Sequence, residues 1–107
     1  MLFDHRTYTT KPGRLQKQLA IYREFGWEVQ RELLGEPVAF LITESGPLNS
    51  YVHIWAYRDA ADRASRRTKL LADVRWQKYL EVSGQAENLI SQQTQLMNEA
   101  PFFSLKR

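Results

Sequence analysis

Five side chains with functional groups fall on two segments that both alternate in the manner of β-strands. In the first segment they take every second position, at Asp4, Arg6 and Tyr8, and in the second they are His53 and Trp55. Successive side chains of a strand point to opposite faces, so each set lies on one face of its own strand. A carboxylate, a guanidinium, a phenol, an imidazole and an indole on one surface can bind a small aromatic or anionic molecule.

These residue types predict distinct roles in such a site. The planar guanidinium of Arg6 suits a carboxylate of the ligand, and the indole of Trp55 suits a ring. His53 is the candidate general acid or base, because an imidazole with an unperturbed pKa titrates near neutral pH. The same residues also allow a structural interpretation, in which Asp4 and Arg6 pair in the core of a dimer and His53 forms a hydrogen bond across it. The sequence leaves these two interpretations open.

The composition excludes several kinds of chemistry. A chain of 107 residues is the length of one domain, 1–107, and without cysteine it has no thiol nucleophile, thiolate-held cluster or disulfide. Two histidines and the lack of the familiar hydrolase, dinucleotide and phosphate-loop motifs predict neither a cofactor nor a metal. A metal shared by His5 and His53 is not expected, because strand alternation directs His5 to the helix side, away from the face that carries Asp4.

Charge gives little sign of a polyanionic partner. Fifteen basic against twelve acidic residues leave a net charge of +3. The densest basic cluster, at Arg63, Arg66, Arg67 and Lys69, is interpreted as the solvated face of a helix, so no nucleic acid is expected. The first residues have no basic segment followed by an apolar run, and we expect a cytoplasmic protein without a membrane span.

The elements that position these side chains follow from hydrophobic spacing and turn residues. Four segments have strand character, at residues 2–9, 38–42, 51–57 and 91–98. The first helix is expected from residue 15, with an apolar stripe that extends to Val29 and a stop at Gly35. Asp59 and Asp73 are the predicted N-caps of two later helical segments. The order strand, helix, strand, strand, helix, strand predicts an α+β protein with the ferredoxin-like βαββαβ arrangement.

In that arrangement the helices cover one face of the sheet and leave the other uncovered. The rings of Tyr51, Trp55 and Tyr57 share one face of their strand, and we expect them on the uncovered side. Left in water they would expose ~450 Å² of surface, and monomers rarely tolerate an apolar patch much larger than that. We therefore predict a homodimer in which two sheets pack face to face. The five candidate residues would then line a pocket on this open face of the sheet.

Several short motifs, in order along nearly the whole chain, resemble the NIPSNAP family. They are residues 6–9 with Lys11-Pro12-Gly13, Gly46-Pro47-Leu48-Asn49 with His53-Ile54-Trp55, the segment 70–76 around Asp73, and Phe103-Ser104-Leu105. The resemblance implies the dimeric α+β barrel fold, in which two ferredoxin-like subunits pack sheet to sheet. It implies no reaction, because one fold hosts many chemistries and the small bacterial members of the family have no established one.

Three functions are compatible with the sequence. The first is a homodimer that binds a small aromatic or anionic molecule through Asp4, Arg6, Tyr8 and Trp55. The second, suggested by enzymes that share the barrel, is a cofactor-independent monooxygenase or isomerase in which His53 exchanges protons. The third is a protein interaction module whose aromatic face serves only assembly. The sequence leaves open whether the protein is an enzyme, and only the first two functions need a partly polar cavity.

Overall fold

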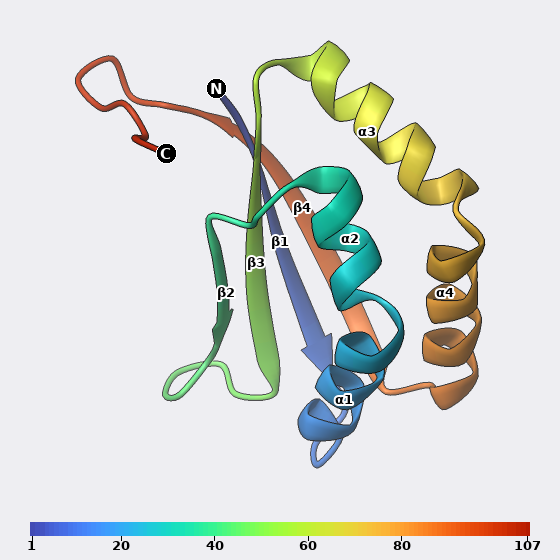
Figure 1. Cartoon of the computed structure of the whole chain (residues 1–107). Coiled ribbons are helices and arrows are strands. Elements are labelled where there is room, and N and C mark those ends of the chain that lie inside the picture. The colour runs from blue at the N-terminus through green and yellow to red at the C-terminus, as the bar shows by residue number, and fades with distance from the viewer.

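The computed structural model describes the whole chain, residues 1–107. Its elements form two layers, a four-stranded antiparallel sheet in the order β2-β3-β1-β4 and four helices on one face of that sheet (Figure 1). The elements are, in chain order, β1 (Leu2–Thr10), α1 (Leu15–Phe25), α2 (Trp27–Leu34), β2 (Ala39–Ile42), β3 (Ser50–Tyr57), α3 (Ala60–Ala72), α4 (Val74–Ala86) and β4 (Leu89–Asn98). The expected α+β, ferredoxin-like arrangement is confirmed.

Both predicted N-caps are present and fix where the two later helices begin. The Asp59 carboxylate accepts a hydrogen bond from the backbone N–H of Asp62 at 2.8 Å, and the Asp73 carboxylate accepts one from the N–H of Arg75 at 2.8 Å. Each carboxylate satisfies an N–H that has no partner inside the first helical turn. These caps set the start of α3 and α4 and hence which of their side chains meet the sheet.

The first helical segment is interrupted at Gly26, so the single helix predicted through Val29 is two helices. At the break the chain passes close to α4. A Cβ atom at Gly26 would lie 3.1 Å from Cδ1 of Tyr22 and 3.2 Å from ring atoms of both Trp76 and Tyr79. Only glycine allows this close approach without displacing the rings.

The ring-bearing face of β3 is turned toward the helices. The rings of Tyr51, Trp55 and Tyr57 are each at most 2 % exposed, and the latter two pack with helix residues. The expectation that these rings lie on the uncovered face is therefore wrong. The strand register confirms that both candidate sets share the helix side, with Asp4 opposite Trp55, Arg6 opposite His53 and Tyr8 opposite Tyr51.

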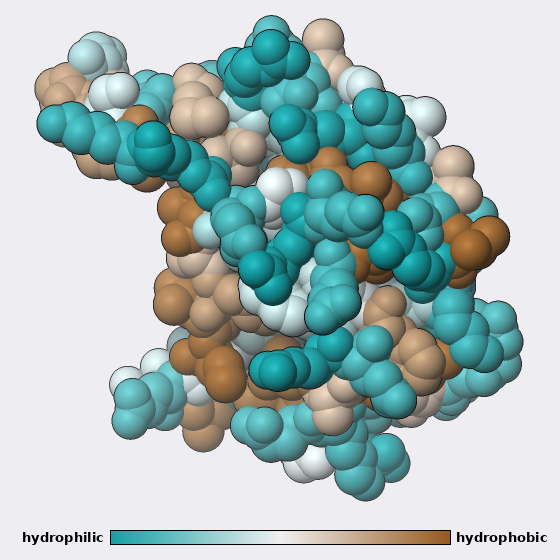
Figure 2. Space-filling model, in the orientation of Figure 1, coloured by the Kyte–Doolittle hydropathy of each residue, from teal (hydrophilic) through white to brown (hydrophobic).

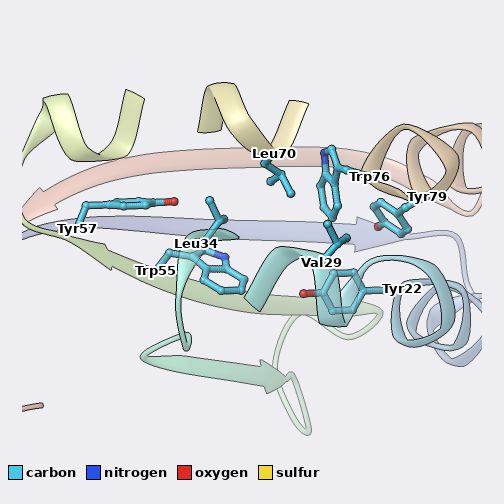
Figure 3. Close-up of a cluster of buried hydrophobic side chains, with 8 residues drawn as sticks. All are labelled: Tyr22, Val29, Leu34, Trp55, Tyr57, Leu70, Trp76 and Tyr79. Atoms are coloured by element: carbon cyan, nitrogen blue, oxygen red, sulfur yellow. The ribbon is translucent and has the colours of Figure 1, made fainter. Parts of the chain in front are cut away.

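The core occupies the layer between sheet and helices (Figure 3). Its buried members are mostly large rings, and they are Tyr22, Val29, Leu34, Trp55, Tyr57, Leu70, Trp76 and Tyr79. Because aromatic side chains bury the largest area, covering them with the chain's own helices stabilises the fold more than covering the smaller aliphatic side chains would. The smaller apolar side chains are left on the other face of the sheet.

The open face of the sheet consists of Phe3, His5, Val52, Ile54 and their neighbours. His5 pairs with Ile54 in the register and lies on this face, so the expectation that it points to the helices is wrong. At the edge of this face, Leu41 of β2 is 56 % exposed. Figure 2 shows hydrophobic side chains gathered at the surface over this edge.

The C-terminal tail crosses one end of the open face. It leaves β4 and reaches the segment before β2, where the guanidinium of Arg107 donates to the backbone carbonyl of Glu36. Between tail and sheet lies an apolar cleft of about 550 Å³, which Phe3, Ile54 and Phe103 help to line. Phe102 stays 93 % exposed, so the tail only partly docks on the body. The helices are all too short or too polar to span a bilayer.

Candidate functional site

A small cavity of about 80 Å³ lies between the sheet and the helices. Most of its lining carries a ring or a hydrogen-bonding group, and the lining residues are Tyr8, Tyr22, Gln30, Tyr51, His53, Trp76, Tyr79, Leu80, Ser83, Leu89 and Gln92. Leu80 is 47 % exposed and Gln92 is also exposed, so the cavity opens to solvent at the edge between α4 and β4. A partly polar, ring-lined hollow of this kind is typical of small-molecule sites.

The sheet side of the cavity is an array of nearly parallel rings from three adjacent strands. His53 stacks with Phe40 at 4.9 Å between ring centroids and with Tyr8 at 5.1 Å, with interplanar angles of 7° and 8°. Tyr8 also stacks with Tyr51 at 5.2 Å. Neighbouring strands lie close to 5 Å apart, so side chains on one face of adjacent strands meet at stacking distance. Because the rings cover one another's faces, the array presents their edges to the cavity.

His53 sits in this array as a neutral imidazole. The indole Nε1–H of Trp55 donates to Nδ1 of His53 at 2.5 Å, so Nδ1 carries no proton and the remaining proton is on Nε2. Nε2 has no hydrogen-bond partner within the chain. Burial, reinforced by the positive charge of Arg6, lowers the pKa of His53 to about 3. The expectation that His53 titrates near neutral pH is therefore wrong.

The helix side supplies hydroxyl and amide groups already engaged with one another. The hydroxyl of Tyr22 donates to Oε1 of Gln30 at 2.5 Å. The amide of Gln18 donates to the Tyr79 hydroxyl at 3.3 Å and to Oγ of Ser83 at 3.0 Å. Burial raises the pKa of Tyr79 to about 12 and that of Tyr22 still further, so these phenols keep their protons at neutral pH.

A compact ion-pair cluster lies next to the cavity along β1. The carboxylate of Asp4 is completely buried, and its Oδ1 accepts from Nε of Arg6 at 3.0 Å. Its Oδ2 accepts from Nε of Arg63 on α3 at 2.9 Å and from Nη2 of Arg6 at 3.3 Å. Arg63 therefore lies against the sheet, and the interpretation of this arginine cluster as a solvated helix face is wrong for Arg63.

The five predicted residues thus share one face and fall into two adjoining groups. Tyr8 and His53 line the cavity. Trp55 is fully buried beside His53 on the same face of β3, where its ring is inaccessible to a ligand. Asp4 and Arg6 belong to the ion-pair cluster, and Arg6 is already paired within the chain. The structure brings the set together on the helix side of the sheet instead of the open side.

The residues that the helices contribute were not predicted from the sequence. Tyr22 and Tyr79 pack in the core, and both also border the cavity. Gln18 and Gln30 are buried amides on the sheet-facing sides of α1 and α2. A glutamine at a position that faces the core is the signal that could have revealed them, because a buried amide needs partners.

Comparison with known proteins identifies the family. The sequence profile of the NIPSNAP family matches residues 3–104. A curated NipSnap homolog of Dictyostelium discoideum is 39 % identical over 75 residues, which are 70 % of this chain and 33 % of that protein. The chain therefore spans about a third of the length of that curated relative.

Solved structures agree in the fold. A crystal structure from Agrobacterium tumefaciens matches with a TM-score of 0.89 and 36 % identity over 99 % of this chain and 100 % of that one. A NIPSNAP family protein of the same organism gives 0.89 and 30 % identity over 98 % of each chain. An antibiotic biosynthesis monooxygenase matches 94 % of this chain and 100 % of its own at a TM-score of 0.65 and 20 % identity, which shows a shared fold alone. The profile match and these relatives together place the chain in the NIPSNAP family.

Proposed function

We propose that the protein is a homodimer in which each subunit binds a small aromatic molecule in the cavity between sheet and helices. The observation that carries this proposal is the position of His53. Its ring is part of the stacked array, and its Nε2–H has no hydrogen-bond partner in the chain. An aromatic ligand with an oxygen substituent suits both features, by edge-to-face contact with the ring edges and by accepting the Nε2–H hydrogen bond.

The size of the cavity limits how the ligand enters. About 80 Å³ is roughly half of the ~150 Å³ known to admit benzene in another protein. Only part of a ring therefore fits inside, and the rest of the ligand extends through the opening between α4 and β4. This opening is bordered by the exposed side chains of Leu80 and Gln92.

Binding is favoured over proton-transfer catalysis by the state of the imidazole. With a pKa of about 3, His53 is a weak base at neutral pH, because the imidazolium is disfavoured by burial and by Arg6. The monooxygenase and isomerase hypotheses need His53 to exchange protons. The interaction-module hypothesis needs the rings on the outside, whereas they lie under the helices. Hydrogen-bond donation by a neutral His53 requires neither condition.

The proposed dimer uses the open face of the sheet. The expected reason for it, exposed rings on β3, does not apply, but the aliphatic row on this face and the exposed phenylalanines of the tail still leave apolar surface uncovered. Exposed apolar patches of this extent mark association surfaces. A second copy of the sheet fits because family resemblance implies the same face-to-face packing.

Phenol and cyclohexanol test the cavity as a matched pair of probes, one flat and one puckered. We expect phenol to shift the NMR signals of His53 and Tyr79 and cyclohexanol to have little effect. His53→Phe keeps a stacking ring but removes the donor, and it should weaken phenol binding about fivefold, the equivalent of one hydrogen bond. His5→Phe, on the open face, is the control and should leave binding unchanged.

Two results would oppose the proposal. One is phenol binding that His53→Phe and His5→Phe affect equally, because the donor would then play no part. The other is the absence of any phenol-induced shift at the cavity residues. Native mass spectrometry of the freshly purified protein adds an independent measurement, since a retained small molecule would appear as a fixed mass increment per subunit.

A further inference from the structure

The ion-pair cluster beside the cavity carries more positive than negative charge. Arg6 and Arg63 contact one carboxylate, that of Asp4, and Arg67 lies close enough for the same carboxylate to influence its pKa. Both oxygens of Asp4 are already occupied by Arg6 and Arg63, whose side chains are only 13 % and 24 % exposed. Charges removed from water in this way are stabilised only when they are neutralised by a partner. One aspartate neutralises one of the three guanidiniums.

Arg67 is the cation left without a partner. It lies one helical turn after Arg63 on α3, at the i+4 position, and on the side that continues to the buried Leu70. Its guanidinium is half-buried and takes part in no hydrogen bond or ion pair within the chain. Burial, followed by the charges of Arg6 and Arg63, lowers the pKa of Arg67. The surroundings thus disfavour its charge, and nothing in the chain compensates for it.

Tyr57 supplies a second polar group without a partner. Tyr57 is 1 % exposed, and its buried hydroxyl has no hydrogen-bond partner. The side chain lies in the layer between the sheet and α3 (Figure 3). Burial and the nearby Asp4 raise its pKa to about 12, so the hydroxyl remains a donor. The Tyr57 hydroxyl and the Arg67 guanidinium lie close enough to influence each other's pKa, and an unpaired donor and an unpaired cation share one kind of partner, an anion that accepts hydrogen bonds.

The cluster and the cavity share an open edge. Along β4 the side chains opposite Tyr8, Arg6 and Asp4 are Gln92, Thr94 and Leu96, and all three are exposed although they lie on the helix side. Two residues along a strand advance about 7 Å. A molecule lying on β4 with its ring at Tyr8 therefore reaches Arg6 with a substituent about one ring's length away.

We infer that Arg63, Arg67 and the Tyr57 hydroxyl form a binding site for an anionic group, a carboxylate or a phosphate, of a small molecule. Arg67 supplies the charge, Tyr57 donates a hydrogen bond, and Arg63, held by Asp4, borders the site. This inference rests on the proposed function insofar as the anion belongs to the same ligand whose ring enters the cavity. The site itself is built from residues that do not line the cavity.

Inorganic phosphate tests the site without any ring. We expect phosphate to shift the arginine side-chain NMR signals of the unmodified protein and to raise its melting temperature as its concentration increases. Arg67→Gln removes the charge from a guanidinium that makes no contact within the chain, and it should weaken phosphate binding at least tenfold. Lys69→Gln removes the same charge from an exposed position on the same helix and should leave binding unchanged. Tyr57→Phe should weaken it by a smaller factor, about fivefold.

Ring compounds separate this inference from the proposed function. Benzoate and phenyl phosphate should each bind more tightly than phenol, with the gain lost in Arg67→Gln, and the tighter of the two identifies the anionic group. Phenol binding with no gain for either anion would overturn the anion site and leave the cavity proposal intact. Phosphate binding at Arg67 without binding of any ring compound would overturn the cavity proposal and leave the anion site intact. Phosphate affinity equal in Arg67→Gln and Lys69→Gln, or unmoved arginine signals, would also overturn it.

Discussion

The imidazole of His53 lies among stacked rings on the helix side of the sheet, and its neighbours decide its chemistry. Trp55 fixes the proton on Nε2, the stacked rings of Tyr8 and Phe40 exclude water, and Arg6 opposes a second proton. A histidine in these surroundings acts as a hydrogen-bond donor with a fixed orientation. This state makes a measurable contribution to stability as a function of pH.

We predict that the protein loses stability in mild acid because of His53. Its folded-state pKa of about 3 lies below the ordinary value of 6.5, so between these values the unfolded chain binds a proton that the folded chain does not. Stability is thus fully present above about pH 6.5 and falls as the pH drops toward 3, by up to about 1.4 kcal/mol per pH unit for one proton. Urea unfolding at pH 7, 6, 5 and 4 measures the slope.

The control for this measurement is His53→Gln, which keeps a side-chain acceptor for the Trp55 indole but has no titrating group. The acidic residues titrate in both proteins, so the difference between their slopes isolates His53. Parallel curves for the two proteins between pH 6.5 and 4 would show that the imidazole is protonated normally in the fold.

At the residue scale, the sequence predicts which side chains share a face of a strand better than it predicts which face of the sheet that is. That Asp4, Arg6 and Tyr8 share a face follows from alternation alone, and so does the pairing of His53 with Trp55. Which face they share depends on whether helix side chains cover them. The pKa of His53 depends on burial, which no spacing within one strand reveals.

At the scale of elements, the helical layer is shaped by where α1 and α2 meet α4. The apolar stripe from residue 15 to Val29 predicts one helix, because it has the helical period throughout. The interruption falls at Gly26, where a Cβ atom would meet rings of Trp76 and Tyr79, about fifty residues further along the chain. An isolated glycine is tolerated inside a helix, so the local pattern alone does not predict a boundary there. The caps at Asp59 and Asp73 are local features and were predicted correctly.

Adding side-chain atoms at two glycines of the helical layer should change the stability of the protein in opposite directions. Gly26→Val forces atoms into three rings that a Cβ would already approach to within 3.2 Å, and it should destabilise the protein by about 1–3 kcal/mol. Gly84→Ala, inside α4 with nothing within 4 Å of the new Cβ, should stabilise it by about 0.5–1 kcal/mol. Chemical denaturation of both variants gives the two values, and equal effects would contradict the close-approach argument.

At the scale of the whole molecule, the two faces of the sheet differ in what covers them. The ring-bearing face is closed by the chain's own helices, and the aliphatic face is closed only at one end, by the tail. The ferredoxin-like order of elements was predictable because most of the strands and the two capped helices have local signals. The assignment of the faces was not, since aromatic and aliphatic rows on β3 are both apolar and periodicity alone does not rank them.

We predict that Ile54→Asp weakens self-association and leaves the fold of each subunit intact. Ile54 lies on the open face, where a carboxylate in a sheet-to-sheet contact would be buried without a partner. Val74→Asp places the same charge at another apolar position, 75 % exposed at the start of α4, and should have no effect. Sedimentation analysis across concentrations, with circular dichroism to check folding, measures both. Identical association of Ile54→Asp and Val74→Asp would place the contact elsewhere.

Along β3 the side chains alternate between the interior and the open face at every residue. Insertions or deletions within β3 therefore keep each side chain on its face only when they change the length by an even number of residues. Insertion or loss of one codon inside β3 would bring indole and phenol rings out into water on one side of the change and carry valine or isoleucine inward. A change of two codons restores the alternation. Natural length variation should therefore concentrate in the 43–49 hairpin loop, and any that occurs within β3 should come in even numbers of residues.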